Sequence, residues 1–119
     1  MPKINKKFTF VYDELSDRLF ISGKTEKDSV YGSMRILNIT LDFTTDNKII
    51  NIELRRASKY LESLGVNPKI LSNLTGAEIV VQQRRDGYLI YFILYSGEQV
   101  ERIPYNIFTL NEKPLIISA

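Results

Sequence analysis

The chain has 119 residues, of which 44% are hydrophobic and 25% charged, and its 16 basic and 14 acidic residues give a formal net charge of +2. This is the composition of one ordinary globular domain, 1–119, and no apolar run reaches the roughly 20 residues that span a membrane. The absence of Cys and His excludes disulfides and thiolate metal sites and removes the commonest general base. We therefore expect a protein that uses no cofactor and no metal.

The first predicted elements are two short strands joined by an acidic turn. Phe8, Phe10 and Tyr12 alternate with polar or smaller residues, which predicts a strand with one aromatic face. The turn Asp13–Asp17 follows, and Leu19–Ile21 forms the second strand.

A charged loop spans 23–28, and 30–34 is interpreted as a bulged lead-in to the next strand, with Gly32 at the irregular point. Two alternating apolar runs then face each other across the turn 45–48: Leu37, Ile39, Leu41 and Phe43 on one, and Ile50, Ile52 and Leu54 on the other. A slip of one residue would turn every one of these side chains outward, so the pattern fixes a register. In this register Asp42 opposes Asn51 and Thr40 opposes Glu53, and we expect Asn38, Thr40, Asp42 and Glu53 to lie outside the core.

Two short helices are expected next. Ser58 is the predicted cap of the first, and Gly65 suits its left-handed C-terminal position. Asn67 and Pro68 open the second, with Ile70, Leu71 and Leu74 on its apolar side and Gly76 after its end. A helix-turn-helix interpretation is disfavoured, because both helices are short and lack a basic recognition face.

The last third returns to strands. Segments 77–85 and 88–96 flank Asp86-Gly87, a strong hairpin signal, and a two-residue turn there places Ile79 opposite Leu94 and Val81 opposite Phe92. A further strand runs from 99 to 103, with Pro104 at a strand end or sheet edge, and 113–117 predicts a terminal strand. The opposite face of the hairpin carries the candidate interface residues Val80, Tyr91, Ile93 and Tyr95.

Two acidic clusters are candidates for a chemical role. Asp42 and Glu53 point the same way from neighbouring strands, with Arg55 nearby, so they form either an acid pair for general acid–base work or a charge-balanced solvated face, which we favour. Asp13, Glu14 and Asp17 could hold a cation, although turn formation explains them better.

Basic residues form two predicted patches: Arg55, Arg56 and Lys59 in one, and Arg84, Arg85 and Arg102 near the Asp86-Gly87 turn in the other. With Tyr88, Tyr91 and Tyr95, the second patch suggests a base-stacking surface. A net charge of +2 is too small to indicate a nucleic-acid partner, so we expect no tight binding.

The N-terminal half also resembles a known family, through Tyr12-Asp13, Asp17–Ile21, Ile39–Phe43, Ile50–Leu54 and Ala57-Ser58. These segments resemble the consensus of the prokaryotic domain-of-unknown-function family numbered 2283. The chain departs from it at Asn47-Lys48, where the family has a turn glycine, and at Asn51, which replaces the glycine before Ile-Glu. The resemblance implies a fold and a cytosolic prokaryotic setting, and it supplies no activity.

The sequence thus predicts an α+β domain: a mostly antiparallel, meandering sheet of six to eight strands with two short helices between the N- and C-terminal strand sets. The charged start, 1–7, lacks the apolar segment of a signal peptide, so we expect a cytoplasmic protein. The leading function is a non-enzymatic protein acting through a homodimer or another protein partner, with no membrane. The first alternative is a nucleic-acid-binding regulatory module, such as the antidote-like half of a two-gene pair, and the second is a carboxylate-based or metal-dependent hydrolase.

Overall fold

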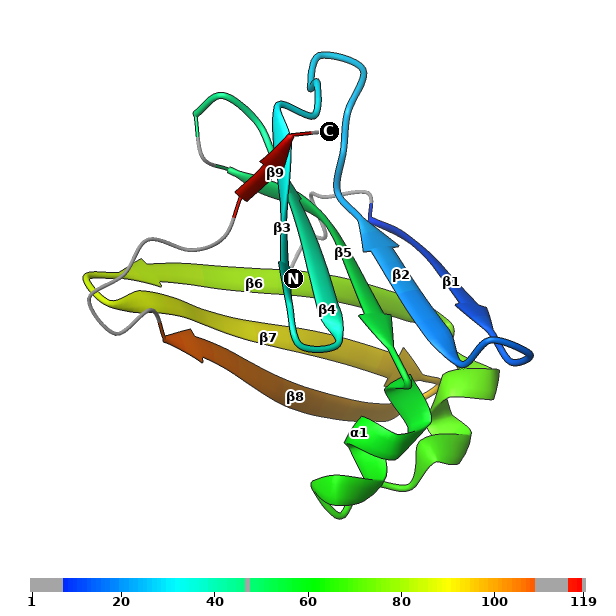
Figure 1. Ribbon diagram of the computed structural model, residues 1–119. Helices are drawn as coiled ribbons and strands as arrows, with labels where there is room; N and C mark the ends of the chain where they lie inside the picture. The colour runs from blue at the N-terminus through cyan, green and yellow to red at the C-terminus, as the bar shows by residue number, and fades with distance from the viewer. Residues whose placement is uncertain (1–7, 47, 109–115, 119) are drawn as a thin grey trace.

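The computed structural model describes residues 8–46, 48–108 and 116–118. These residues form mostly antiparallel sheet with two short helices (Figure 1). The strands are β1 Thr9–Asp13, β2 Arg18–Ser22, β3 Gly32–Ile36, β4 Ile39–Phe43, β5 Ile49–Arg55, β6 Gly76–Arg84, β7 Gly87–Ser96, β8 Gln99–Phe108 and β9 Ile116–Ser118. The α-helix α1 (Ala57–Ser63) and the 3-10 helix η1 (Pro68–Asn73) lie between β5 and β6 in the chain.

The strands form two sheets where the sequence pattern predicted one. The larger has the order β1-β2-β5-β4-β3-β9, and the smaller is the meander β6-β7-β8. In Figure 1 the strands of the two sheets cross at a steep angle. Two packed sheets allow more strands than the six to eight expected, because each sheet covers the apolar face of the other.

The apolar faces of the two sheets pack against each other and form one hydrophobic core. Ala57 and Leu61 of α1 and Ile70 and Leu71 of η1 are buried in the same core. Each sheet covers the apolar face of the other, and the helices add to one end of the core (Figure 1). The buried sheet residues include Leu19, Ile21, Met34, Leu41, Ile52, Leu54, Ile90, Phe92, Leu94, Ile103, Tyr105 and Ile107.

The predicted pairing of β4 with β5 is confirmed. Asp42 pairs with Asn51 and Thr40 with Glu53, while Leu41 and Ile52 are buried on the inner face. The register shifts between Asp42 and Phe43, because a bulge in β5 accommodates one extra residue next to the turn.

The placement of Leu37 in the core was wrong. Its side chain is 84% exposed, because Leu37 and Asn38 form the turn between β3 and β4. Leu37 has a φ of +52°, the left-handed region that suits such a turn and that no strand residue adopts. The stretch interpreted as a bulged lead-in is therefore a separate strand, β3, whose Met34 pairs with Leu41.

The hairpin of β6 and β7 is present, but its predicted register was wrong by two residues. Ile79 pairs with Phe92 and Val81 with Ile90, so the turn is formed by Arg85 and Asp86. Neither turn residue has a positive φ, which the type I′ turn favoured by an Asp-Gly pair requires. A shift of two leaves every side chain on its predicted face, because the strand period is also two.

The first helix does not begin as predicted. Arg56, with a φ of +58°, is the N-cap residue and makes no side-chain capping bond, whereas Ser58 lies inside the helix. The predictions for Gly65, which has a φ of +79°, and for Asn67, whose side chain accepts a hydrogen bond from the Lys69 N–H, are confirmed.

The C-terminal strands extend the predicted ones. β8 is an edge strand and contains Pro104, as expected of a proline in a sheet. β9 pairs with β3 of the larger sheet. The rest of the predicted terminal strand, 113–115, lies outside the described residues.

Candidate functional site

The candidate polar residues Asp42, Glu53 and Arg55 all lie on the outer face of the larger sheet. Each alternates with a buried residue of β4 or β5, which fixes its outward direction. All three side chains are partly exposed. The structure therefore places them on one face, as the sequence predicted.

Asp42 belongs to a row of hydrogen bonds that crosses four strands. Its carboxylate accepts hydrogen bonds from the Ser33 hydroxyl at 2.6 Å and the Asn51 side-chain amide at 3.0 Å. The Asn51 side-chain oxygen in turn accepts from the Ser22 hydroxyl at 2.6 Å. These are cross-strand neighbours, so the row ties β3, β4, β5 and β2 together.

Glu53 and Arg55 belong to a second network. Glu53 Oε2 lies 3.1 Å from Arg18 Nη1, and Glu53 Oε1 lies 3.9 Å from Arg55 Nη1. Arg55 also donates to the Thr40 hydroxyl at 2.9 Å and to the Leu37 carbonyl at 2.9 Å. Each carboxylate thus has its own partners, and this arrangement is that of the charge-balanced face.

The three acidic residues of the first turn diverge. Asp13 accepts from the Leu15 N–H and the Ser16 hydroxyl within its own turn, and Glu14 accepts from the Ser72 hydroxyl at 2.7 Å. Asp17 turns towards α1. Among the residues that the structure describes, no group of three potential ligands is placed to hold a metal ion.

Asp17 is the polar residue whose role the sequence interpretation missed. Its carboxylate accepts from the Tyr12 hydroxyl at 2.6 Å, from the Ser58 N–H at 2.9 Å and from the Ser58 hydroxyl at 2.8 Å. Its carbonyl accepts from the Ala57 N–H at 3.0 Å. Asp17 therefore caps α1 from another part of the chain.

Tyr12, Asp17, Ala57 and Ser58 lie in three sequence segments, Tyr12-Asp13, Asp17–Ile21 and Ala57-Ser58, and the fold brings all four residues together. These positions therefore have a structural role in this chain.

The Asp17 network shifts two pKa values. Burial alone would raise the pKa of Asp17, but the hydrogen bonds from Tyr12 and Ser58 outweigh it and hold this pKa below its usual value. Burial, followed by the hydrogen bond to the Asp17 carboxylate, raises the pKa of Tyr12. Asp17 is thus ionised and Tyr12 neutral at physiological pH.

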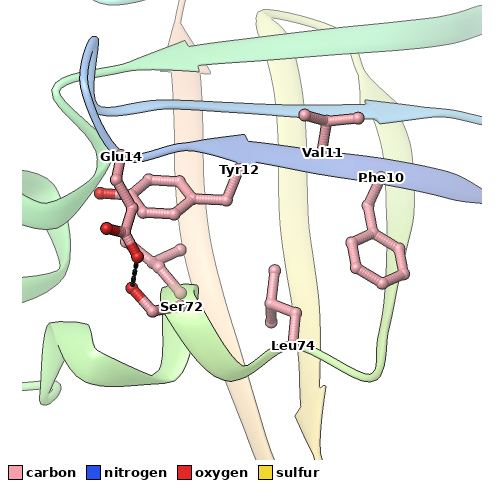
Figure 2. Close-up of a pocket in the computed structure, with 7 residues that line it drawn as sticks. Phe10, Val11, Tyr12, Glu14, Ser72 and Leu74 are labelled. Carbon is pink, nitrogen blue, oxygen red and sulfur yellow. Dashed lines mark hydrogen bonds between the residues drawn. The ribbon is translucent and has the colours of Figure 1, made fainter.

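A depression of about 210 Å³ lies between β1 and η1 (Figure 2). It is smaller than the roughly 300–1,000 Å³ of typical small-molecule sites, and the Glu14–Ser72 hydrogen bond lies at one end. Neither Asp42 nor Glu53 lines it. The lining residues are Phe10, Val11, Tyr12, Glu14, Leu71, Ser72 and Leu74.

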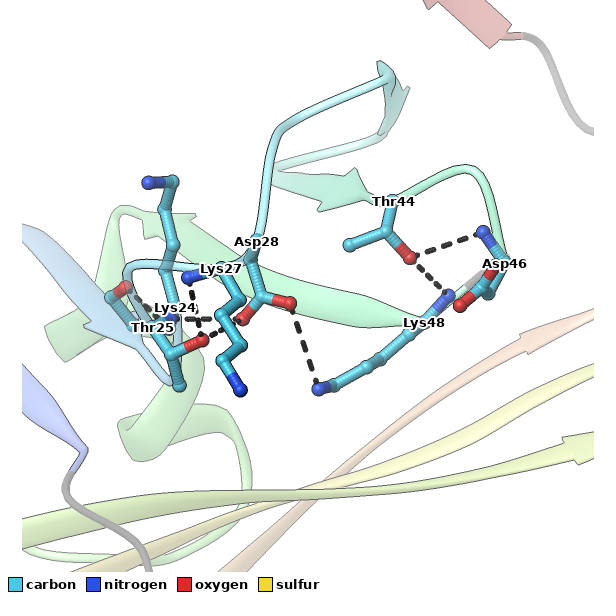
Figure 3. A network of polar contacts seen from close by, with 8 residues as sticks. Lys24, Thr25, Lys27, Asp28, Thr44, Asp46 and Lys48 are labelled. Atoms are coloured by element: carbon cyan, nitrogen blue, oxygen red, sulfur yellow. Dashed lines mark hydrogen bonds and ion pairs between the residues drawn. The ribbon is translucent and has the colours of Figure 1, made fainter.

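A polar network joins the β2–β3 and β4–β5 loops (Figure 3). Asp28 accepts from the Thr25 N–H and hydroxyl at 2.8 and 3.0 Å, and it lies 3.8 Å from the Lys48 ammonium. The hydrogen bonds from Thr25 hold the pKa of Asp28 below its usual value. Thr44 accepts from the N–H groups of Asp46 and Lys48, so this network organises the two loops.

The outward face of the smaller sheet, which we call the β7 face, carries all four candidate interface residues. Val80 of β6 pairs with Tyr91 of β7, and Ile93 and Tyr95 follow on the same side of β7. Each of the four side chains is partly exposed, whereas the alternate residues of β7 are buried in the core. Leu89, Val100 and Pro104 extend this apolar surface.

Charged side chains lie over the β7 face. The Arg102 guanidinium lies 4.7 Å from the centre of the Tyr91 ring, a cation–π contact. Glu78 is beside Tyr95, whose pKa is raised by burial and then by the Glu78 carboxylate. The face therefore combines an apolar centre with Glu78 and Arg102 at its two edges, and Arg84 lies on the same side of β6 near the turn.

The predicted second basic patch was wrong. Arg84 and Arg85 are at the β6–β7 turn, but Arg102 pairs with Ile93, six residues along β7 from Gly87. At about 3.4 Å per residue, this separates Arg102 from the turn by about 20 Å. The register, which the sequence did not determine, decides this distance.

Comparisons with protein-family models, with curated proteins and with solved structures found no match for this chain. No helix among the described residues has the length and apolar character needed to cross a membrane.

Proposed function

We propose that this protein is a non-enzymatic binding protein that acts as a homodimer through the β7 face. The observation that carries the proposal is that β7 has apolar side chains on both of its faces. Ile90, Phe92 and Leu94 are buried, and the partly exposed Tyr91 and Ile93 lie between them. A strand apolar on both faces is typical of a sheet covered on both sides, and the larger sheet covers only one of them.

The size of the β7 face suits a reversible dimer. Its strands have nine or ten residues each, so they span about 30 Å by 14 Å at ordinary strand dimensions. Side chains that protrude from the sheet add to this area. The surface buried on both copies together is then about 1,000–1,200 Å², which is at the small end of specific interfaces. We therefore expect a dissociation constant on the order of micromolar.

The alternatives have less support. Tyr91 could stack on a base, but Arg102 already covers its ring, and the Glu78 carboxylate on the same face repels phosphate. For a hydrolase, Asp42 and Glu53 would have to share a substrate, whereas each lies on the outer sheet face with partners of its own.

The proposal includes the α+β class, because both helices add buried residues to the core of the two sheets. It also includes a cytoplasmic prokaryotic setting and membership of the domain-of-unknown-function family numbered 2283. These rest on the absence of Cys and on the resemblance of the N-terminal half.

Sedimentation equilibrium of wild type, Ile93→Asp and Val11→Asp tests the proposal. Val11 is 60% exposed on β1 of the other sheet, so its substitution is a matched control. Wild type and Val11→Asp should be dimeric at about 200 µM, well above the expected dissociation constant, and Ile93→Asp monomeric. A monomeric wild type at this concentration overturns the proposal, and so does a dimer that Ile93→Asp leaves intact.

A further inference from the structure

We infer that the twofold axis of the dimer runs parallel to β7, so that Glu78 of each copy pairs with Arg102 of the other. This inference rests on the proposed function, because it specifies how the β7 face meets a second copy. The inference depends on the strand register. The register determines which residues of β6, β7 and β8 are cross-strand neighbours, and we call each such set of three on the β7 face a row.

The central row of the β7 face has an acid at one edge and a base at the other. Glu78 of β6 pairs with Ile93 of β7, and Ile93 pairs with Arg102 of β8. None of the ion pairs found among residues 8–46, 48–108 and 116–118 includes Glu78 or Arg102. Glu78 interacts with the Tyr95 hydroxyl and Arg102 lies on the Tyr91 ring, but neither of these partners carries the opposite charge, so both charges can pair with a second copy.

A twofold axis along the central strand exchanges the two edges of the sheet. When two copies meet face to face around such an axis, β6 of one lies over β8 of the other. Each set of cross-strand neighbours on β6, β7 and β8 then faces the same set of the other copy, with its β6 and β8 ends exchanged. Glu78 of each copy then lies against Arg102 of the other copy, once on each side of the axis. Ile93 of one copy meets Ile93 of the other on the axis. One symmetry operation thus makes two opposite-charge contacts around an apolar centre.

The neighbouring rows are compatible with the same axis. In one row Val80 and Pro104 lie on either side of Tyr91, so apolar residues meet across the interface. In the next row, Gln82 and Asn106 are exposed at the two edges, so one side-chain amide meets another. None of these rows brings like charges together.

The perpendicular axis is less favourable. A twofold axis running across the strands at Ile93 would bring Glu78 against Glu78 and Arg102 against Arg102. Like charges that face each other across an interface weaken association. Centred on Tyr91 instead, that axis would place both charged residues opposite uncharged amides and form no ion pair.

The twist between packed sheets leaves Glu78 of one copy opposite Arg102 of the other. Packed sheets are rotated by about 30°, which moves a residue one strand from the axis by about 2.4 Å. Successive residues on one face of a strand are about 6.8 Å apart, so Glu78 stays nearest to the Arg102 row.

Reversing the charges tests the axis. Glu78→Arg and Arg102→Glu should each weaken dimerisation at least about 30-fold, because each replaces two attractive contacts by two repulsive ones. The double variant should recover the wild-type dissociation constant to within about fivefold. An equimolar mixture of the two single variants should form a heterodimer, since its charges are again complementary.

Two further variants control for net charge. Glu98→Arg and Arg85→Glu change exposed turn residues by the same charge and should leave dimerisation unchanged. Circular dichroism checks that each variant is folded, and the recovery of the double variant separates lost pairing from misfolding.

The outcomes separate this inference from the proposed function. If wild type dimerises and Ile93→Asp blocks it, while the charge reversals have no effect or the double variant does not recover, the axis is wrong and the β7 face remains the interface. If wild type is monomeric, both are overturned.

Discussion

The carboxylate of Asp17 holds the first turn of α1 through Ser58, which lies 41 residues further along the chain. It accepts hydrogen bonds from the Ser58 N–H at 2.9 Å and the Ser58 hydroxyl at 2.8 Å. A single aspartate thus joins the β1–β2 hairpin to the helix that follows β5. This cap replaces the local one that the sequence pattern indicated.

Replacing Asp17 should destabilise the protein, and the size of the effect should depend on the substitution. Asp17→Asn keeps the shape and the tolerance of a positive φ, so we expect a loss of about 1 kcal/mol in the free energy of unfolding. Asp17→Ala also removes the acceptor and strains the backbone at a φ of +57°, so we expect a loss of about 2–3 kcal/mol. Urea denaturation at neutral pH measures both, and equal stability of all three proteins would contradict the cap.

The contribution of the Asp17 charge should depend on pH. The folded-state pKa is lowered, so the charge stabilises the fold above the unfolded-state pKa, about 3.9, and this stabilisation is lost as pH falls through the folded pKa. The difference in unfolding free energy between wild type and Asp17→Asn should therefore shrink on acidification through this window. A difference that grows there would show that the sign is wrong.

Leu37 should tolerate glycine better than alanine. Its positive φ disfavours any side chain with a Cβ, so Leu37→Gly should raise the unfolding free energy by about 0.5–1 kcal/mol. Leu37→Ala removes the same exposed side chain without relieving the backbone and should change stability by less than about 0.5 kcal/mol. Thermal denaturation of the three proteins compares them, and a destabilised glycine variant would mean that the Leu37 side chain makes a needed contact.

Tyr105 should stabilise the contact between the two sheets. Its hydroxyl donates to Asn38 Oδ1 at 2.6 Å, and the Asn38 amide donates to the Arg55 carbonyl at 2.8 Å. Tyr105→Phe leaves the Asn38 oxygen without this donor and should cost about 1–2 kcal/mol. Tyr31→Phe, at a side chain that is 67% exposed, is the control and should be neutral in urea denaturation. Equal effects of the two substitutions would contradict this role.

Single-stranded nucleic acid should bind weakly, and its binding should fall steeply with salt. The net charge is +2, and the base nearest the centre of the β7 face, Arg102, already contacts Tyr91. Fluorescence anisotropy with a labelled oligonucleotide should detect no binding at physiological salt. Tight, sequence-selective binding under these conditions would favour the nucleic-acid alternative over the proposed homodimer.

The sequence by itself determined which side of β4, β5, β6 and β7 faces the core. Leu41 and Ile52 are buried, while Asp42 and Glu53 point outward, because a period of two assigns faces without knowledge of neighbours. For the same reason the two-residue error at the β6–β7 turn left Tyr91 and Ile93 on their predicted face.

Only the tertiary structure decided the contacts between distant segments. The division into two sheets, the cap of α1 by Asp17 and the pairing of Ile93 with Arg102 depend on how strands from different parts of the chain come together. Leu37 shows the same limit locally, because an alternating pattern continues through a turn whenever the turn residue is itself apolar. Local patterns encode the direction of a side chain, whereas its partner depends on the packing of the whole chain.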